Sequence, residues 1–217
     1  MPPILETGYV MKIDADAVLW SAPERERAGR PLLVLLHGYG SHEGDLFDLS
    51  PGLPLGPVIA AVRAPLLAGP GHAWFPLTEE TPIDQLGGNA DAAAAAMLDW
   101  LDTTESTSVG LLGFSQGGAT ALQLLRLAPN RFAYAVTLAG FVVGSSHPGD
   151  ADLAARRPPV FWGRGTLDDR IPAAAIAATE RWLPEHSELT FRSYQGLGHG
   201  ISNAELADVN AFLSGHL

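Results

Sequence analysis

The sequence predicts an α/β protein with a mostly parallel central sheet and helices on both of its faces. Three observations support this class. Short apolar runs alternate with helix-like stretches along most of the 217 residues. Several runs are apolar at nearly every position, which is typical of strands buried on both faces of a sheet. One serine, Ser115, is bracketed by glycines where such a run meets a helix-like stretch.

The runs that we interpret as strands are spread over the whole chain. The first of them, residues 17–23, is followed by the polar turn ERERAGRP. Further strands are expected at residues 31–38, 56–65, 108–115, 132–140, 158–165 and 189–196. Parallel neighbours in a sheet need a long connection between them, which is usually a helix.

Helices are expected in most of these connections. The alanine-rich residues 84–103 form the first, with Met97, Leu98 and Leu101 on its apolar side. The others are expected at residues 116–129, 173–184 and 202–217. No internal repeat or linker divides the sequence, so residues 1–217 are expected to form a single domain.

The composition excludes several classes of function. The net charge of -11 and the absence of a Lys/Arg cluster argue against a nucleic-acid partner. The chain has no cysteine, which excludes disulfides, thiolate metal sites and a cysteine nucleophile. The N-terminus lacks the pattern of a signal peptide, and no apolar run approaches the length that spans a membrane. We therefore expect a cytoplasmic protein without membrane insertion.

The motif GFSQG around Ser115 predicts a nucleophilic serine. A sharp strand-to-helix turn exposes the hydroxyl, and side chains two residues before and after it would clash. Glycine at both positions, Gly113 and Gly117, removes that clash. The alternative is a glycine-rich turn in which Ser115 only caps the following helix. The strand before it and the helix after it favour the nucleophile.

A serine nucleophile needs a base, and the base needs an acid to orient it. His199, in the loop GLGHG after the run at 189–196, is the favoured base. The acid is expected in the loop RGTLDDRIP, where Asp168 and Asp169 are both candidates. Three other histidines follow the serine and are interpreted as weaker candidates or solvated side chains: His147, His186 and His216.

The oxyanion of an acyl-transfer reaction is held by two backbone N–H groups. One is expected from Gln116, the residue after the serine, where the helix N-terminus adds positive potential. The second is expected from Tyr39 in the loop HGYG that follows the run at 31–38. His37 in the same loop is interpreted as a structural residue.

In combination, these blocks resemble the phospholipase/carboxylesterase family of α/β-hydrolases, which includes the acyl-protein thioesterases. The blocks LLHGYG, GFSQGG, DDRIP and GLGHGIS occur in that family's order. The resemblance spans residues 17–215. It implies an α/β-hydrolase fold and a Ser-His-Asp esterase that needs neither a metal nor an organic cofactor. The segment between the strands at 132–140 and 158–162 is too short for a separate cap domain. The register of the family's motif, fixed here by Ile171-Pro172, makes Asp168 the acid.

The resemblance also leads to an expected substrate class. The segment AWFPL looks like the family's aromatic segment beside the acyl pocket. Four apolar residues are therefore expected to bind the substrate: Leu66, Trp74, Phe75 and Phe141. Without a cap, a short- to medium-chain ester is the expected substrate. Thioesterase, lysophospholipase-type or acyl-transfer activity on the same triad remains an alternative, as does a non-catalytic binding protein of this fold.

Overall fold

The computed structural model describes residues 11–77, 82–144 and 146–217. The expectation that the N-terminus is no signal peptide concerns mainly residues 1–10, which lie outside these ranges. The main sheet has seven strands in the order β1-β3-β2-β6-β7-β8-β9. Their bounds are β1 Leu19–Trp20, β2 Leu32–Leu36, β3 Val58–Val62, β6 Val109–Phe114, β7 Tyr134–Leu138, β8 Pro159–Gly165 and β9 Glu188–Tyr194.

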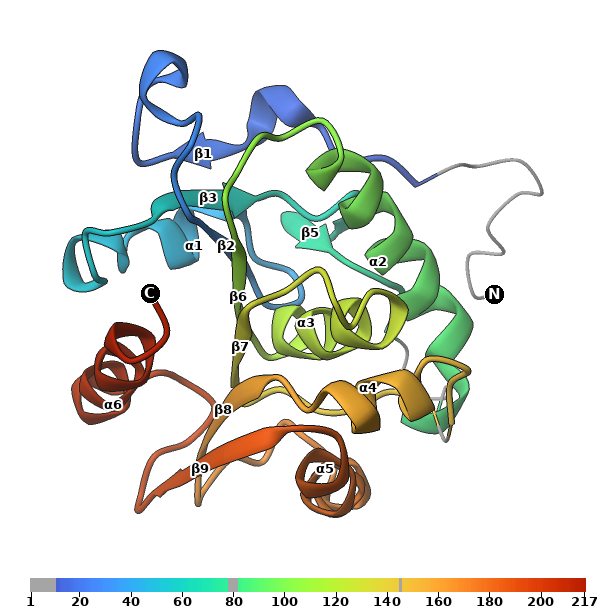
Figure 1. Cartoon of the computed structure of the whole chain (residues 1–217). Helices are drawn as coiled ribbons and strands as arrows, with labels where there is room; N and C mark the ends of the chain where they lie inside the picture. Colours follow the sequence, from blue (N-terminus) through green and yellow to red (C-terminus); the bar gives the residue numbers. More distant parts are fainter. Residues whose placement is uncertain (1–10, 78–81, 145) are drawn as a thin grey trace.

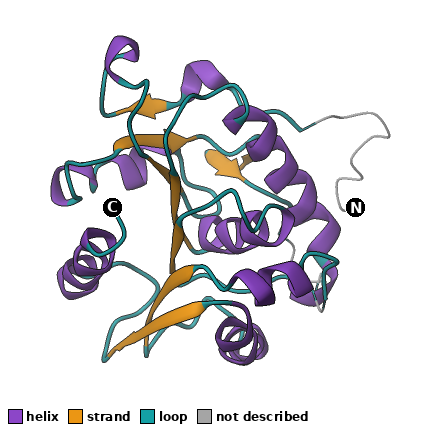
Figure 2. Cartoon of the chain, in the orientation of Figure 1, coloured by secondary structure: helices purple, strands orange, loops and turns teal. Residues whose placement is uncertain are grey.

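In the main sheet, β2, β3, β6, β7, β8 and β9 run parallel to one another, and β1 is antiparallel to β3. Helices cover both faces of the sheet: α1 and α6 lie on one face, and α2, α3, α4 and α5 on the other (Figures 1 and 2). Their bounds are α1 Glu43–Phe47, α2 Gly87–Leu101, α3 Gln116–Leu127, α4 Asp150–Arg156, α5 Ala173–His186 and α6 Asn203–Ser214. The predicted α/β architecture is confirmed.

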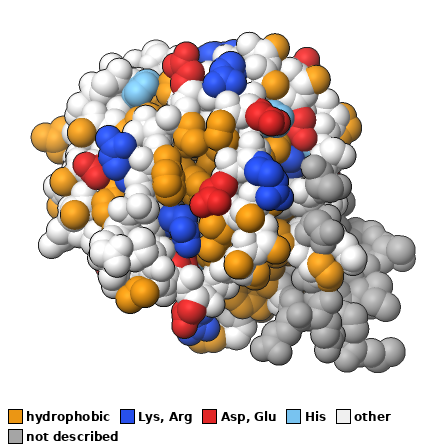
Figure 3. Space-filling view, turned by 90° about the horizontal axis from the view of Figure 1, so that it is seen from below, with side chains coloured by type: hydrophobic (Ala, Val, Ile, Leu, Met, Phe, Trp, Pro, Cys, Tyr) orange, Lys and Arg blue, Asp and Glu red, His pale blue; other side chains and the backbone are white. Residues whose placement is uncertain are grey.

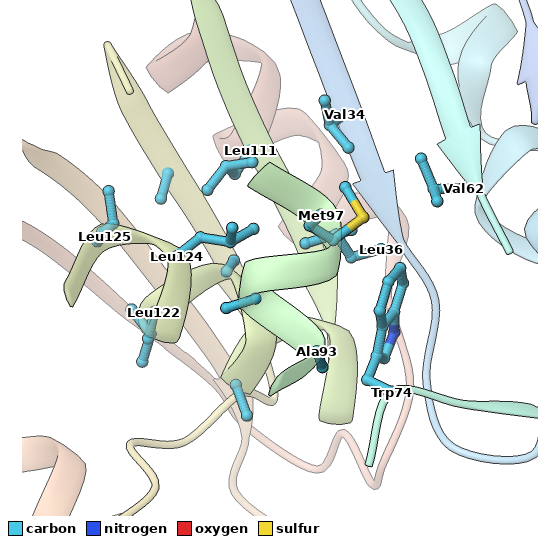
Figure 4. Close-up of a cluster of buried hydrophobic side chains, with 14 of the residues drawn as sticks. Val34, Leu36, Val62, Trp74, Ala93, Met97, Leu111, Leu122, Leu124 and Leu125 are labelled. Atoms are coloured by element: carbon cyan, nitrogen blue, oxygen red, sulfur yellow. The ribbon is translucent and has the colours of Figure 1, made fainter. Parts of the chain in front are cut away.

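The core lies in two layers, one on each face of the sheet, and β2 contributes to both. Leu32, Val34 and Leu36 belong to the cluster beneath α2 and α3, part of which is drawn in Figure 4. Leu33 and Leu35 belong to the cluster beneath α6. Successive side chains of a strand point to opposite faces, so a strand buried on both faces needs an apolar residue at every position.

The structure also differs from the elements expected from sequence. Helix α2 begins at Gly87 rather than at residue 84. A short hairpin, β4 Leu66–Ala68 and β5 Gly71–Ala73, follows β3 and was not expected. Within the described part of the β7–β8 connection, α4 is the regular element, so no separate cap domain is seen there. Across the described ranges, no helix is long and apolar enough to cross a membrane.

Candidate active site

Ser115 lies in a strained turn between the end of β6 and the start of α3. Its backbone has φ 55° and ψ -117°, a conformation that residues other than glycine rarely adopt. The two flanking glycines are required by close backbone contacts. A Cβ on Gly113 would collide with the Gly117 carbonyl, and a Cβ on Gly117 would collide with the carbonyl of Leu36 on β2. The Ser115 hydroxyl makes no capping hydrogen bond to α3.

The Ser115 hydroxyl instead meets the imidazole of His199. Nε2 of His199 lies 3.0 Å from Oγ of Ser115, and Nδ1 of His199 lies 2.9 Å from Oδ2 of Asp168. Because a carboxylate accepts hydrogen bonds, Nδ1 carries the proton and Nε2 is the acceptor for the serine hydroxyl. Three segments far apart in the sequence therefore meet at the carboxyl end of the sheet, as binding sites of open parallel sheets do.

Asp168 and His199 are both held in place by further contacts. The Asp168 side chain is 1% exposed, and its second oxygen, Oδ1, accepts from the backbone N–H groups of Arg170 at 3.0 Å and Ile171 at 3.3 Å. The His199 ring packs against Phe114, with the two centroids 4.9 Å apart. The neighbouring Asp169 is exposed. The geometry thus distinguishes the two carboxylates that the sequence left adjacent.

The other downstream histidines lie in local contacts elsewhere. Nε2 of His147 is 3.4 Å from Asp91, and its Nδ1 accepts from the Gly149 N–H. His186 and His216 each donate from Nδ1 to the backbone carbonyl four residues earlier in the chain, at 2.7 Å and 2.8 Å. None of these three imidazoles contacts Ser115.

The expected oxyanion donors are Gln116, which directly follows Ser115, and Tyr39, which lines the same cavity as Ser115. In the described part of the chain, neither the Tyr39 N–H nor the Gln116 N–H donates to another protein group. The β4–β5 hairpin fixes the loop around Tyr39 by two backbone hydrogen bonds of 2.8 Å, from Gly40 N to His72 O and from His72 N to Ser41 O. Both amides are therefore available for an oxyanion near the serine.

Gln116 also has a role that its position in the motif did not predict. Its side chain is fully buried, with Oε1 accepting from Trp74 N at 2.9 Å and Nε2 donating to Phe75 O at 2.6 Å. The amide thus ties the chain after β5 to the residue that follows the serine. In the motif GFSQG, the polar side chain of Gln116 at the start of an apolar helix was the sequence signal of this contact.

His37 supports the same region from the other side. Its Nδ1 lies 2.8 Å from Gly38 O, and its Nε2 accepts from Ala64 N at 3.1 Å. The indole Nε1 of Trp74 donates to His37 O at 2.8 Å. Burial lowers the pKa of His37 below its usual value, although the Gly38 carbonyl opposes that shift. His37 is therefore a neutral structural residue.

A cavity of about 1200 Å³ opens beside Ser115 and His199. Phe141, one of the expected substrate residues, lines it. Leu66, Trp74 and Phe75 are not among the residues that line this cavity. Trp74, which is labelled in Figure 4, is fully buried in the core cluster, as is Phe75, and Leu66 packs against that cluster.

Most of the other residues in the cavity wall were not expected there from the sequence. Its apolar part comes from Leu77, Pro82, Ile83, Val142, Ile171, Pro172, Ala174, Ala175 and Ala178. Its polar part includes Tyr39, Ser41, Asp45 and Arg170, with Ser41 Oγ donating to Asp45 at 2.7 Å. No group of three or more potential metal ligands occurs among the described residues.

Comparisons with known proteins indicate the family of this chain. A family model described as Phospholipase/Carboxylesterase matches residues 21–217. A probable carboxylesterase of Oryza sativa subsp. japonica is 30% identical over 155 residues, which cover 67% of this chain but only 58% of the rice protein. Acyl-protein thioesterase 1 of Kluyveromyces lactis is 30% identical over 222 residues, covering 88% of this chain and 93% of the yeast protein. The crystal structure of esterase PE8 superposes with a TM-score of 0.75 at 28% identity, covering 95% of this chain and all of that one.

Proposed function

The chain belongs to the phospholipase/carboxylesterase family of serine hydrolases, and we propose that it hydrolyses short- to medium-chain carboxylic esters through an acyl-enzyme. Ser115, His199 and Asp168 are the proposed catalytic residues. The observation that carries this proposal is the continuous pair of hydrogen bonds, 3.0 Å and 2.9 Å long, that connects the three side chains. A non-catalytic binding protein would not need this connection.

In the proposed reaction, Ser115 Oγ attacks the ester carbonyl carbon while His199 Nε2 removes the hydroxyl proton. The tetrahedral intermediate collapses, and the imidazolium gives that proton to the departing alcohol. Water then attacks the acyl-serine, His199 removes its proton, and the carboxylic acid leaves as Ser115 is reprotonated. Asp168 remains ionised and stabilises the imidazolium that forms in each half of the cycle.

The carbonyl oxygen becomes negatively charged in both tetrahedral intermediates. The backbone N–H groups of Tyr39 and Gln116 are the proposed donors to this oxyanion, since both are unoccupied by protein acceptors in the described ranges. Removing one donor from such a site costs about 10²–10³ in turnover in a serine-protease template. The positive end of α3 adds to the potential at Gln116.

The cavity has room for a small ester, and the absence of a cap from the described ranges supports short acyl chains. About 1200 Å³ beside Ser115 accommodates both the acyl and the alcohol part of a small ester. The described chain has no cap domain that would shield a long acyl chain from water. A thioester could react on the same groups, and the name of the yeast relative favours keeping this second activity in the test.

A series of soluble esters and thioesters, from acetyl to palmitoyl, tests the proposal. We expect the highest kcat/KM at short or medium acyl length, and no activity or fluorophosphonate labelling after Ser115→Ala. Ser214→Ala, at an exposed site on α6, is the control and should retain both. An optimum at palmitoyl would contradict the substrate range. Turnover by the Ser115→Ala variant would contradict the nucleophile.

A further inference from the structure

Strand β9 is an edge strand with a largely exposed outer side. It is the last strand of the sheet and pairs with β8 over its whole length, from Pro159 opposite Glu188 to Gly165 opposite Tyr194. Helices α5 and α6 lie on either side of it (Figure 1). The molecule seen from this side shows hydrophobic side chains gathered between charged ones (Figure 3). An edge of this kind is a template for pairing with another strand.

The hydrogen bonds to the neighbouring chain show which backbone groups of β9 face outward. Glu188 N donates to Pro158 O at 3.0 Å, and Tyr194 O accepts from Thr166 N at 3.0 Å. Even-numbered residues therefore direct their backbone groups toward β8. Because this direction alternates along a strand, those of Leu189, Phe191 and Ser193 point away from the sheet. The Arg192 side chain reaches the Phe191 carbonyl at 2.9 Å, as an outward carbonyl allows.

The side chains of β9 divide between the two faces of the sheet. Phe191 packs on Trp162 with centroids 4.8 Å apart, and Leu189 packs against the core cluster that contains Trp162, beneath α5. Arg192 approaches Asp208 of α6 at 4.0 Å, so Arg192 and, by alternation, Glu188 lie on the α6 face. Phe191 remains 38% exposed, and Glu188 and Arg192 are also exposed.

This pattern is complementary to itself. In an antiparallel pair of two β9 strands related by a two-fold axis at Thr190, Glu188 lies opposite Arg192 of the second copy, and the same pair repeats on the other side of the axis. Leu189 lies opposite Phe191 of the second copy on the α5 face. The outward backbone groups of Leu189 and Phe191 are then the hydrogen-bonded positions of an antiparallel ladder, in which the Arg192 side chain leaves the Phe191 carbonyl of its own chain and pairs with Glu188 of the second copy. Backbone, charge and apolar patterns agree in this single register.

We propose that β9 is the interface of a homodimer in which two sheets join at this edge. Edge strands that are protected from pairing often carry charged side chains, especially Lys, or Pro. β9 contains neither Lys nor Pro, and its two charged residues have opposite signs at symmetric positions. Shifting the axis to Arg192 or to Glu188 would bring like charges together, which is unfavourable. The charges therefore select the register centred on Thr190. The occupant is a second copy of this chain.

Charge reversal tests the proposal by sedimentation velocity over a range of protein concentrations. The wild type is expected to have the mass of two chains at high concentration. Glu188→Arg opposes two arginines at both ends of the ladder and should raise the dissociation constant about tenfold or more. Arg192→Glu should do the same with carboxylates. The double variant Glu188→Arg/Arg192→Glu exchanges the two charges and should restore the dimer.

Glu26→Arg is the matched control. It reverses a carboxylate in the exposed 3₁₀ turn Glu24–Glu26, near β1 at the opposite end of the sheet, and should leave the mass unchanged. Ester hydrolysis and circular dichroism verify that each variant is folded, since β9 contributes no proposed catalytic residue. A wild type that is monomeric at every concentration overturns the proposal. So does a dimer that either single reversal leaves intact, or one that the double variant fails to restore.

Discussion

Asp168 Oδ2 lies 2.9 Å from Nδ1 of His199, while the adjacent Asp169 is exposed. The turn that follows β8 explains this difference. Oδ1 of Asp168 accepts two backbone N–H groups, from Arg170 and Ile171, which fixes the carboxylate with its other oxygen toward the imidazole. The side chain of Asp168 is thereby buried and oriented before any substrate binds.

Replacing the two aspartates separately tests the assignment of the acid. Asp168→Asn keeps the shape of the side chain but favours the wrong tautomer of His199, and the corresponding change in a serine protease lowers turnover about 10⁴-fold. We expect a loss of several orders of magnitude in kcat. Asp169→Asn is the control and should change kcat by less than about threefold, as expected for a surface site. The reverse result would assign the acid to Asp169.

Gly117→Ala tests the close approach of α3 to β2. The new Cβ would meet the carbonyl of Leu36, which is backbone and has little freedom to move. We expect a loss of about 3 kcal/mol or more in the free energy of unfolding. In Gly88→Ala, at an exposed site in α2, the new Cβ meets nothing within 4 Å, and stability should be unchanged or slightly higher. Equal denaturant midpoints for both variants would contradict a close contact between Gly117 of α3 and the Leu36 carbonyl of β2.

Gln116→Met tests the buried amide separately from the backbone N–H of the same residue. Methionine has a similar length but leaves Trp74 N–H and Phe75 C=O without their partner. Each unsatisfied group costs about 1–3 kcal/mol, so urea denaturation should show a loss of about 2 kcal/mol or more. The exposed Gln195→Met is the control. Wild-type stability in Gln116→Met would show that the two hydrogen bonds contribute little.

Ala178→Phe tests which surface receives the acyl chain. Ala178 lines the cavity from α5, and a phenyl ring there should shorten it. We expect kcat/KM for octanoyl esters to fall about tenfold or more while acetyl esters are affected much less, because each methylene in an apolar pocket is worth about 1–3 kcal/mol. Ala177→Phe is the control on the same helix, at a position that does not line the cavity. Equal losses for both chain lengths would assign the acyl group to another part of the wall.

Glu205 is expected to make stability depend on pH. It lies in the first turn of α6, is 1% exposed, and neither carboxylate oxygen has a hydrogen-bond partner among the described residues. Burial raises its pKa from 4.5 to about 7. Below pH 4.5 the carboxyl is protonated in both the folded and the unfolded state, so it does not lower the free energy of unfolding. Between pH 4.5 and about 7 the unfolded state loses this proton first, and the free energy of unfolding falls. Above pH 7 the decrease has reached its full size.

Glu205→Gln removes this ionisation. We expect the free energy of unfolding of the variant, relative to wild type, to rise between pH 4.5 and 7 by about 3 kcal/mol. Denaturant titrations at closely spaced pH values measure this difference. Glu24→Gln, at an exposed site, should show the pH dependence of the wild type. A difference between Glu205→Gln and wild type that does not change with pH would contradict a buried, ionisable Glu205.

The features predicted from sequence are those with a local signature. The runs at 31–38 and 108–115 are apolar because β2 and β6 are buried on both faces, and glycines flank Ser115 because the turn has no room for a Cβ. The positions of Ser115 and His199 follow from such signals, since each lies in the turn or loop after a strand. The local pattern left Asp168 and Asp169 as alternatives, and the family resemblance selected Asp168. The proximity of Ser115, His199 and Asp168 in space then follows from the parallel order of the sheet.

Features that depend on distant contacts were not predictable in the same way. Trp74 and Phe75 have the composition of a pocket wall, and their burial depends on contacts with distant residues: Gln116 binds their backbone, 42 and 41 positions away, and His37 accepts from the Trp74 indole. Helix α4 has only seven residues, and its sequence has no periodic apolar pattern that would have predicted a helix there. The alanines of α5 that line the cavity look in sequence like those of any helix.

The two hydrogen bonds of Gln116 divide the site into a part that must be conserved in shape and a part open to redesign. A substitution or insertion that moves residues 74 and 75 also moves the Gln116 side chain bound to them. Such a change can displace the Gln116 N–H, which is proposed to bind the oxyanion. Selecting new substrate preferences there would put turnover at risk. The α5 wall has no such connection to residue 116 among the described hydrogen bonds, so libraries aimed at Ala174, Ala175 and Ala178 can vary selectivity while the reaction centre keeps its geometry.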